Sequence, residues 1–328
     1  MTSSIAQTIT SKFGRVTISA AISLSFLAAA AFVVHQLLHD IDVGKVLAAL
    51  DAQSIKTIAT AGAFVVAGYV TLTFYDLFAL RMIGHNQVPY SAAALASFAS
   101  STIGHSLGAA VLTGGLVRLR IYAGWGLTVV DIAKIALVTG MTFWLGNILL
   151  LGGAIAYAPG AAGAIDHLPD WANRALGVTG LFGIAGYLAW LAPRPRAVSW
   201  SGWRLVLPSQ RLTLVQIGIG TVDLSLVTLA MYVLLPAAPT VSLVTVLVTV
   251  LTATLLGTVS HAPGGFGVIE ATILIGLAQF QREELLAALI TFRALYFILP
   301  LFFATMSLGL RELHALARPI LARRNHGA

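Results

Sequence analysis

The sequence predicts an all-α integral membrane protein with about six full transmembrane helices, two broken or re-entrant segments and the pattern of an inverted repeat. Composition carries the first part of this prediction. Of the 328 residues, 58% are hydrophobic and 9% are charged, whereas soluble domains average about 45–50% apolar and about 25% charged residues. The mean hydropathy is +0.90. At about 20 apolar residues per helical span, the length admits at most about eight or nine crossings of the membrane.

The first apolar segment covers residues 16–38 and follows two basic residues, Lys12 and Arg15. Its small run Ala28-Ala29-Ala30 resembles a signal-peptidase site. Because hydrophobicity continues beyond this run, we expect an uncleaved membrane anchor.

Five further full spans are expected over residues 55–83, 128–157, 171–191, 212–235 and 284–310. Two other apolar stretches do not resemble lipid-facing spans. Segment A, residues 91–127, combines many serines with several glycines. Segment B, residues 241–281, is broken by the sequence His-Ala-Pro-Gly-Gly-Phe-Gly at residues 261–267.

Basic residues predict the orientation of the chain. The loop over residues 194–211 and the tail over residues 311–328 contain four arginines each, so both should be cytoplasmic under the positive-inside rule. The loop containing Asp166 and Asp170 should face outward. This assignment holds only if segments A and B each return to the side from which they entered. We therefore expect both segments to be re-entrant, and both termini to be cytoplasmic.

The chain is expected to form a single polytopic domain over residues 1–328, with repeats over residues 55–157 and 212–310. Each repeat has the order span, broken segment, span, and the two have opposite membrane orientation. Each first span carries a lone aspartate 13 residues before a proline, and each last span carries a cation, namely Asp76 with Lys134 and Asp223 with Arg293. In inverted-repeat transporters the substrate binds at broken helices near the membrane midplane.

These four charges would together cost on the order of 10 kcal/mol at helix centres unless they are paired or hydrated. One interpretation is an internal polar site; another is a set of structural salt bridges between helices. Asp131 and Lys134 can pair locally because they are three residues apart on a helix. Asp76 can also be solvated beside Arg81.

His105 and His261 are candidate proton carriers or hydrogen-bonded packing residues. Candidate breaks are Gly114 and Gly115 in segment A, and Pro263, Gly264, Gly265 and Gly267 in segment B. Helices that restart after such breaks can bind an anion at their N-termini.

Motifs for enzyme chemistry are absent from the sequence: it contains no H-E-x-x-H, no G-x-S-x-G and no phosphate-binding G-x-x-x-x-G-K-[ST]. The chain has no cysteine, which excludes thiolate metal sites and disulfides. Scattered single basic residues do not indicate nucleic-acid binding. We therefore expect no cofactor, no metal and no nucleic-acid partner.

Two stretches carry a resemblance to a known family. One runs from Pro89-Tyr90 through His105-Ser106-Leu107-Gly108 to Gly-Gly-Leu-Val-Arg-Leu-Arg-Ile-Tyr at residues 114–122, and the other is Pro-Gly-Gly-Phe-Gly-Val-Ile-Glu at residues 263–270. With Trp125-Gly126-Leu127 and Phe-Trp-Leu-Gly at residues 143–146, they resemble the membrane region of bacterial lysylphosphatidylglycerol synthases, also called multiple peptide resistance factors. The resemblance covers about residues 15–315.

This resemblance implies a flippase that moves aminoacylated phosphatidylglycerol to the outer face of the bacterial cytoplasmic membrane, which gives resistance to cationic antimicrobial peptides. The family's soluble synthase domain does not follow before Ala328, so we expect no enzymatic activity, and either a stand-alone member or a piece of a longer protein. Without an ATP motif, transport would be downhill or coupled to protons or membrane potential.

The candidate translocation residues divide by charge. Arg118, Lys134 and Arg293 would bind the headgroup phosphate, whereas Glu270, Asp223 and Asp76 would neutralise its amino group. Two alternatives remain open: a secondary transporter of a small solute, and a non-transporting scaffold for a lipid synthase. The expected partners are phospholipid and a lipid synthase domain or protein. Gly146, Gly152 and Gly153 could support an oligomer, but we favour packing within the chain.

Overall fold

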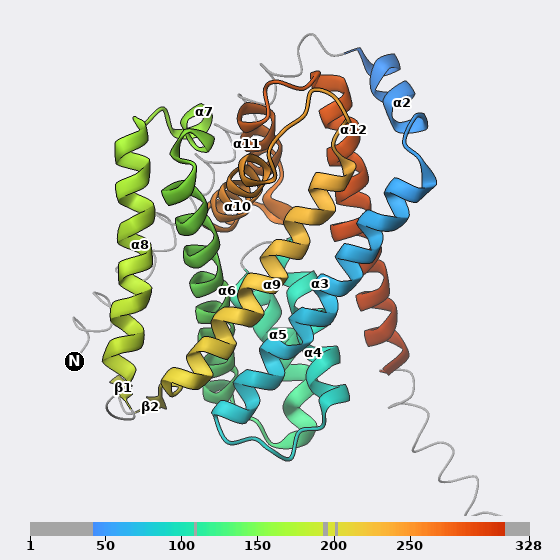
Figure 1. Cartoon of the computed structure of the whole chain (residues 1–328). Coiled ribbons are helices and arrows are strands. Elements are labelled where there is room, and N and C mark those ends of the chain that lie inside the picture. Colours follow the sequence, from blue (N-terminus) through green and yellow to red (C-terminus); the bar gives the residue numbers. More distant parts are fainter. Residues whose placement is uncertain (1–41, 108–109, 193–195, 201–202, 312–328) are drawn as a thin grey trace, which may run out of the picture.

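The computed structural model describes residues 42–107, 110–192, 196–200 and 203–311 (Figure 1). The expected anchor over residues 16–38 and all but the first residue of the basic tail therefore lie outside the described residues. The elements are α2 (Val43–Asp51), α3 (Ile55–Met82), α4 (Tyr90–Leu107), α5 (Ala110–Tyr122), η1 (Ala123–Trp125), α6 (Val129–Tyr157), η2 (Pro159–Ala161), α7 (Gly163–Asp166), α8 (Asp170–Leu191), β1 (Ala197–Trp200), β2 (Trp203–Val206), α9 (Gln210–Leu234), α10 (Leu243–Ser260), η3 (Pro263–Gly265), α11 (Val268–Gly276), α12 (Arg282–Arg293) and the π-helical turn η4 (Ala294–Ile298).

The expected all-α membrane fold is confirmed, with one short antiparallel hairpin, β1–β2, added between α8 and α9. Six helices in the described part of the chain are long and apolar enough to cross a membrane: α3, α6, α8, α9, α10 and the continuous helix Arg282–Arg311, which contains α12 and η4. Five of them coincide with expected full spans. The sixth, α10, is the first half of segment B.

Ser or Thr side chains cap the N-termini of four of these helices, directly before the apolar runs begin. The side chains of Ser54, Ser209 and Ser242 each accept a hydrogen bond from the backbone N–H three residues later, at the starts of α3, α9 and α10. Thr128 and Asp131 form a reciprocal capping box at the start of α6. Such caps satisfy the free N–H groups of a first turn and so fix where each helix begins.

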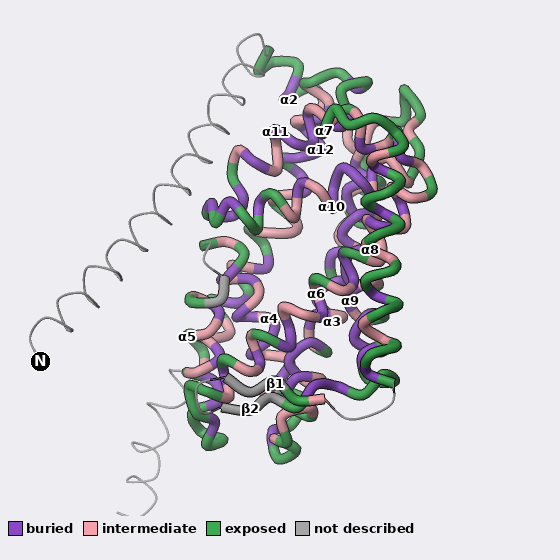
Figure 2. The backbone as a smooth tube through the Cα atoms, turned by 90° about the vertical axis from the view of Figure 1, so that its left-hand side faces the viewer, coloured by how far each residue is buried: buried purple, intermediate pink, exposed green. Residues whose placement is uncertain are grey.

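The two broken segments occupy opposite halves of the molecule. Helices α4 and α5 lie in the lower half of Figure 1, whereas α10 and α11 lie in the upper half, and Figure 2 shows the same division. Helix α3 runs downward from α2, and α9 runs upward from β2 alongside it. The order long helix, two shorter helices, long helix thus occurs twice with opposite direction. Helix α4 contacts η3, so the two broken segments meet inside the bundle.

The break in segment B lies where the sequence predicts it. Pro263, Gly264 and Gly265 form the turn η3, and Gly264 and Gly267 have φ values of 61° and 79°, in the left-handed region that favours glycine. The expected break in segment A is wrong, because Gly114 and Gly115 lie within α5. A methyl group added at Gly114 would come 2.9 Å from the backbone oxygen of Ser100. Gly114 therefore permits close packing of α4, which ends at Leu107, against α5, which begins at Ala110.

Close glycine contacts also join the long helices. Gly146 of α6 faces Gly220 of α9, and Gly152 of α6 faces Gly177 of α8, with backbone atoms in near contact. These contacts confirm intramolecular packing for Gly146 and Gly152, whereas Gly153 has no such neighbour. Small residues allow this approach because no side chain separates the helix axes. Helix α8 is the least buried of the six candidate spans, and its outer side is exposed in Figure 2.

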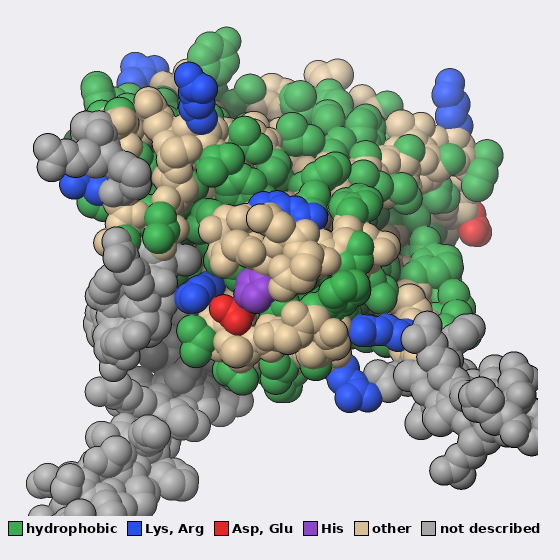
Figure 3. All heavy atoms as spheres, turned by 90° about the horizontal axis from the view of Figure 1, so that it is seen from below, with side chains coloured by type: hydrophobic (Ala, Val, Ile, Leu, Met, Phe, Trp, Pro, Cys, Tyr) green, Lys and Arg blue, Asp and Glu red, His purple; other side chains and the backbone are tan. Residues whose placement is uncertain are grey.

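Basic residues gather at the lower end of Figure 1. They lie at the lower ends of α3, α5, α6, α9 and the last helix and in the hairpin region, namely Arg81, Arg120, Lys134, Arg211, Arg311 and Arg196. Figure 3 views this end and shows Lys and Arg side chains across its whole width. The positive-inside rule assigns this end to the cytoplasm. The location of the two termini stays a prediction.

Candidate functional site

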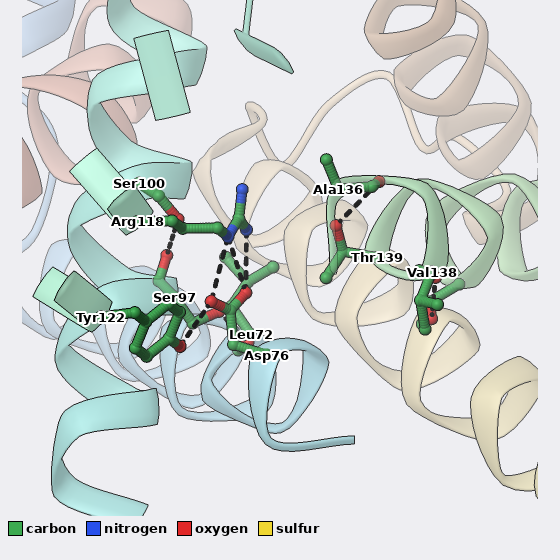
Figure 4. Close-up of polar contacts among 10 residues, drawn as sticks. Leu72, Asp76, Ser97, Ser100, Arg118, Tyr122, Ala136, Val138 and Thr139 are labelled. Atoms are coloured by element: carbon green, nitrogen blue, oxygen red, sulfur yellow. Dashed lines mark hydrogen bonds and ion pairs between the residues drawn. The ribbon is translucent and has the colours of Figure 1, made fainter. Parts of the chain in front are cut away.

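The most buried charged cluster joins α3 to α5. Arg118 Nε lies 3.1 and 3.0 Å from the two carboxylate oxygens of Asp76, and its Nη2 lies 2.8 Å from Oδ1. The Tyr122 hydroxyl donates to Asp76 Oδ2 at 2.8 Å (Figure 4). Arg118 and Tyr122 are four residues apart and so share one face of α5. Asp76 and Tyr122 are 0% exposed and Arg118 is 7% exposed.

The interpretation of Asp76 as a solvated residue beside Arg81 is therefore wrong. Arg81 instead donates to the backbone oxygens of His85, Asn86 and Val88, where the chain turns from α3 into α4. A buried carboxylate and guanidinium with several hydrogen bonds form a tightly coupled unit. Removing one partner from such a pair typically costs about 3–5 kcal/mol, because the other charge is left buried and uncompensated.

The serine-rich stretch of segment A supports this cluster from the side of α4. Ser97 and Ser100 are buried; Ser97 donates to the Leu72 carbonyl oxygen at 2.5 Å, and Ser100 to the Ser97 carbonyl oxygen at 3.2 Å (Figure 4). These hydroxyls bond to backbone carbonyls rather than facing lipid. The prediction that this stretch is not lipid-facing is confirmed at these two serines.

A second ion pair lies beside the break of segment B. Arg293 of α12 donates through Nε to Glu270 of α11 and through Nη1 to the Gly264 carbonyl oxygen at 3.1 Å. The guanidinium carbon lies 4.0 Å from the ring centroid of Phe266 and 5.1 Å from that of Phe297. Both distances allow a cation–π interaction. The Arg293 side chain is 12% exposed and that of Glu270 is 16% exposed, so this pair is more accessible than the first.

Glu270 also fixes the restart of the helix after the break. One of its carboxylate oxygens accepts the Gly267 backbone N–H at 2.8 Å. Its other oxygen binds Arg293, whose Nη2 has no hydrogen-bond partner within the described residues. The ion pair thus connects the break to the last long helix and leaves one guanidinium nitrogen unsatisfied.

Asp223 of α9 differs from the other buried acids. Its Oδ2 accepts the Tyr75 hydroxyl at 3.0 Å, while its Oδ1 has no partner among the described residues. The residue is 5% exposed, and no ion pair involving it occurs in the described part of the chain. Gln216 and Gly220 share this face of α9 by their spacing of seven and three residues from Asp223, and both are buried.

The remaining predicted residues are hydrogen-bonded to none of these three acids, although His105 of α4 lies close enough to interact electrostatically with Arg118. Lys134 pairs locally with Asp131 at 3.6 Å, as the spacing indicated, and His85 lies at the same distance from that carboxylate. His261 caps the end of α10, and its ring Nδ1 lies 2.8 Å from the Val259 carbonyl oxygen. His105 is an exposed residue in the last turn of α4.

The three predicted phosphate-binding cations therefore do not converge on one open site. Each lies beside a carboxylate of the protein: Asp76 for Arg118, Asp131 for Lys134 and Glu270 for Arg293. A cavity of about 380 Å³ between α7, α11 and α12 is lined by none of these residues. Within the described ranges, no group of three or more His, Asp or Glu could hold a metal ion.

Relatives of this chain decide its family. It is 32% identical over 257 residues to the inner membrane protein YbhN of Escherichia coli, an alignment covering 76% of this chain and 79% of that protein. The chain belongs to the YbhN family. It is also 31% identical over 264 residues to the uncharacterized protein slr0712 of Synechocystis, with 80% and 82% covered. No family profile matches the chain. Together with the six candidate spans, the likeness to YbhN identifies a multi-pass inner membrane protein.

Three partners in this YbhN-family protein were missed from the sequence. Tyr122 lies one helical turn after Arg118, and this i, i+4 spacing could have identified it. Phe266 lies inside the glycine-rich break, but nothing in the sequence indicates that its ring contacts Arg293. Tyr75 precedes Asp76 directly and so points to another face of α3, where it binds Asp223 from a distant part of the chain.

Proposed function

We propose that this YbhN-family protein is a phospholipid translocase of the bacterial inner membrane. The observation that carries the proposal is the contact between two broken helical segments from opposite halves of the molecule. Each segment contributes one member of an ion pair with a long helix, namely Arg118 in segment A and Glu270 in segment B. Non-helical backbone at membrane depth is tolerated where protein or a water-filled path satisfies its polar groups. A lipid headgroup needs such a path, whereas its acyl chains can remain in the bilayer.

The ion pairs suggest how a headgroup would enter. Opening the Glu270–Arg293 pair leaves one guanidinium and one carboxylate, each needing a partner. A headgroup phosphate can replace the carboxylate on Arg293, because the planar guanidinium binds phosphate and carboxylate in the same bidentate manner. An ammonium group on the same headgroup can then pair with the released Glu270. The buried Asp76–Arg118 pair would open in the same way at the other end of the path.

This exchange favours a headgroup that carries both a phosphate and an amino group. Aminoacylated phosphatidylglycerol has both groups and is the substrate that the resemblance to lysylphosphatidylglycerol synthases implies. We therefore propose it as the cargo, with a separate synthase as the source of the lipid and no enzymatic activity in this chain. The lower, basic end of the molecule would face the cytoplasm, where both termini would lie.

A second candidate function is a membrane scaffold for a lipid synthase. The pairing of Arg118, Lys134 and Arg293 with carboxylates of the protein favours it, because a scaffold needs buried charges only to fix helix register. A transporter of a small solute fits the two broken segments equally well. The exposed fraction at Glu270 and Arg293 favours access from outside the bundle over a purely structural pair.

A reconstitution experiment separates these functions. Purified protein is incorporated into vesicles containing labelled aminoacylated phosphatidylglycerol, phosphatidylglycerol or phosphatidylethanolamine in one leaflet, and headgroup appearance in the other leaflet is followed over time. We expect the protein to accelerate crossing of the aminoacylated lipid most strongly and phosphatidylglycerol least. Rates equal to those of protein-free vesicles for all three lipids would overturn the translocase and favour the scaffold.

A further inference from the structure

Asp223 lies where α9 packs against α3, the first long helices of the two halves. It projects from α9 toward α3 and adjoins Gly68: a methyl group at Gly68 would lie 3.8 Å from Asp223 Oδ1, an ordinary van der Waals contact. That oxygen is the one without a hydrogen-bond partner, while Oδ2 accepts the Tyr75 hydroxyl. The carboxyl group is therefore buried, half-satisfied and next to a position with no side chain.

No described cation neutralises Asp223. Arg118 is bound to Asp76, and Arg293 is bound to Glu270 and the Gly264 carbonyl oxygen. Helix α10 has no ionisable residue, and α11 has only Glu270. The titratable groups that interact electrostatically with Asp223 are tyrosines: Tyr69 and Tyr75 from α3, and Tyr296 from the π-helical turn η4.

The other helices packed on α9 add no partner. On α6, Asp131 and Lys134 pair with each other at the lower end of the helix, and on α12 the acidic residues Glu283 and Glu284 are in the first turn. Tyr69 donates its hydroxyl to the Tyr296 carbonyl oxygen at 2.9 Å, so it is engaged elsewhere. An isolated carboxylate inside a membrane protein is costly, and a bound proton is the simplest way to remove its charge.

We propose that Asp223 binds and releases the proton that drives transport, an inference that rests on the proposed translocase function. In the closed state Asp223 Oδ1 carries the proton as a neutral carboxylic acid. When the halves move apart and water reaches Oδ1 from the side of Gly68, the O–H bond breaks, the proton passes to water, and the carboxylate remains. That carboxylate then pairs with the headgroup ammonium without forming a covalent bond.

Competition between a proton and an ammonium group for one carboxylate produces exchange. The site is neutralised either by the proton or by the cationic headgroup, so a proton moving in one direction is coupled to a lipid moving in the other. For one-to-one exchange, a gradient of one pH unit supports an accumulation of up to about tenfold in the favoured leaflet. Tyr75 would position the carboxyl group in both states through its hydrogen bond to Oδ2.

The first test uses the same vesicles with a pH gradient of one unit across the membrane. For the wild-type protein we expect net movement of the aminoacylated lipid that reverses when the gradient is reversed. Asp223→Asn should show no difference between the two gradient directions, whatever its rate without a gradient. Asp51→Asn, which removes an exposed carboxylate at the end of α2, is the matched control and should keep the response. Wild-type crossing that is fast but independent of the gradient would overturn the inference and leave the translocase function standing.

The second test does not require transport. Infrared difference spectra recorded across a pH titration detect the C=O stretch of a protonated carboxyl group. We expect one buried-carboxyl band that titrates in the wild type and is lost in Asp223→Asn. If Asp223→Asn folds poorly, Asp223→Glu replaces it, and its carboxyl band should be shifted from that of the wild type. A titrating band that persists unchanged in Asp223→Asn, or its absence from the wild type, would overturn the inference.

Discussion

Asp76 and Asp223 occupy matching positions in the two halves of the molecule but have opposite surroundings. Each lies on the first long helix of its half, 13 residues before a proline. Asp76 receives four hydrogen bonds from Arg118 and Tyr122, whereas Asp223 receives one from Tyr75. The difference arises because α5 carries an arginine and α11 carries no basic residue. Matching positions thus combine a carboxylate held in an ion pair with one that has no ionic partner among the described residues.

The largest expected difference concerns loss of the charge at each position. Asp76→Asn leaves Arg118 buried without its carboxylate, so we expect the free energy of unfolding in detergent to fall by about 3–5 kcal/mol. Asp223→Asn leaves no charge uncompensated and should change stability by less than about 1 kcal/mol. Chemical denaturation of both variants measures the two values.

A double variant distinguishes lost pairing from other damage at Asp76. Asp76→Asn combined with Arg118→Gln removes both charges, and it should recover part of the stability lost in Asp76→Asn. Equal destabilisation by Asp76→Asn and Asp223→Asn would mean that the two carboxylates do not differ as described.

The tyrosines that bind the two carboxylates give the next largest effect. Tyr122→Phe removes a hydrogen bond to an ionised group, which is worth about 1.5–3 kcal/mol, whereas Tyr75→Phe removes one to a neutral carboxylic acid, worth about 0.5–1.5 kcal/mol. Denaturation curves of the two variants against the wild type provide the comparison. A larger loss of stability in Tyr75→Phe than in Tyr122→Phe would indicate that Asp223, and not Asp76, is the ionised carboxylate.

Gly220→Ala tests the contact of α9 with α6, less than one helical turn before Asp223. A methyl group there would collide with the Thr142 carbonyl oxygen and approach Gly146, so overpacking should destabilise the protein by about 1–3 kcal/mol. Gly153→Ala, whose methyl group would meet nothing within 4 Å, is the control. Unchanged thermal stability in Gly220→Ala would contradict the close packing of α6 and α9.

The smallest effect is expected for Gly68→Ala. Its methyl group would contact Asp223 Oδ1 and Leu226 at 3.8 Å, an ordinary van der Waals distance, so stability should change by less than about 0.5 kcal/mol. Its consequence should instead be functional, since the methyl group fills the space through which water would reach Asp223. We expect a weaker response to a pH gradient at nearly normal stability. A strongly destabilised variant would show that this space is already filled.

The sequence was sufficient for features that depend on local patterns. Apolar runs located five of the described spans, and the glycines after Pro263 located one break. Loop charges predicted that segment A returns to its starting side. These features follow from hydropathy, loop charge and left-handed backbone geometry, all of which can be read from short stretches of sequence.

Features that depend on which helices meet could not be predicted. Gly114 resembles a break in the sequence but permits close packing of α4 against α5. The sequence alone does not distinguish a glycine that packs within a helix from one that forms a turn. The pairing of Asp76 with Arg118 rather than with solvent joins residues 42 positions apart. The hydrogen bond from Tyr75 to Asp223 spans 148 positions, so only the packing of α3 against α9 makes it evident.

The account depends on two hairpins that enter from opposite membrane faces, and cysteine labelling tests this directly. The chain contains no cysteine, so single cysteines can be placed at Gln87 and Ala123, which flank α4–α5, and at Ala237 and Gln281, which flank α10–α11. All four residues are exposed. A membrane-impermeant maleimide should label the first two from one face only and the last two from the other face only. Labelling of the two ends of either hairpin from different faces, or of all four sites from one face, would contradict the account.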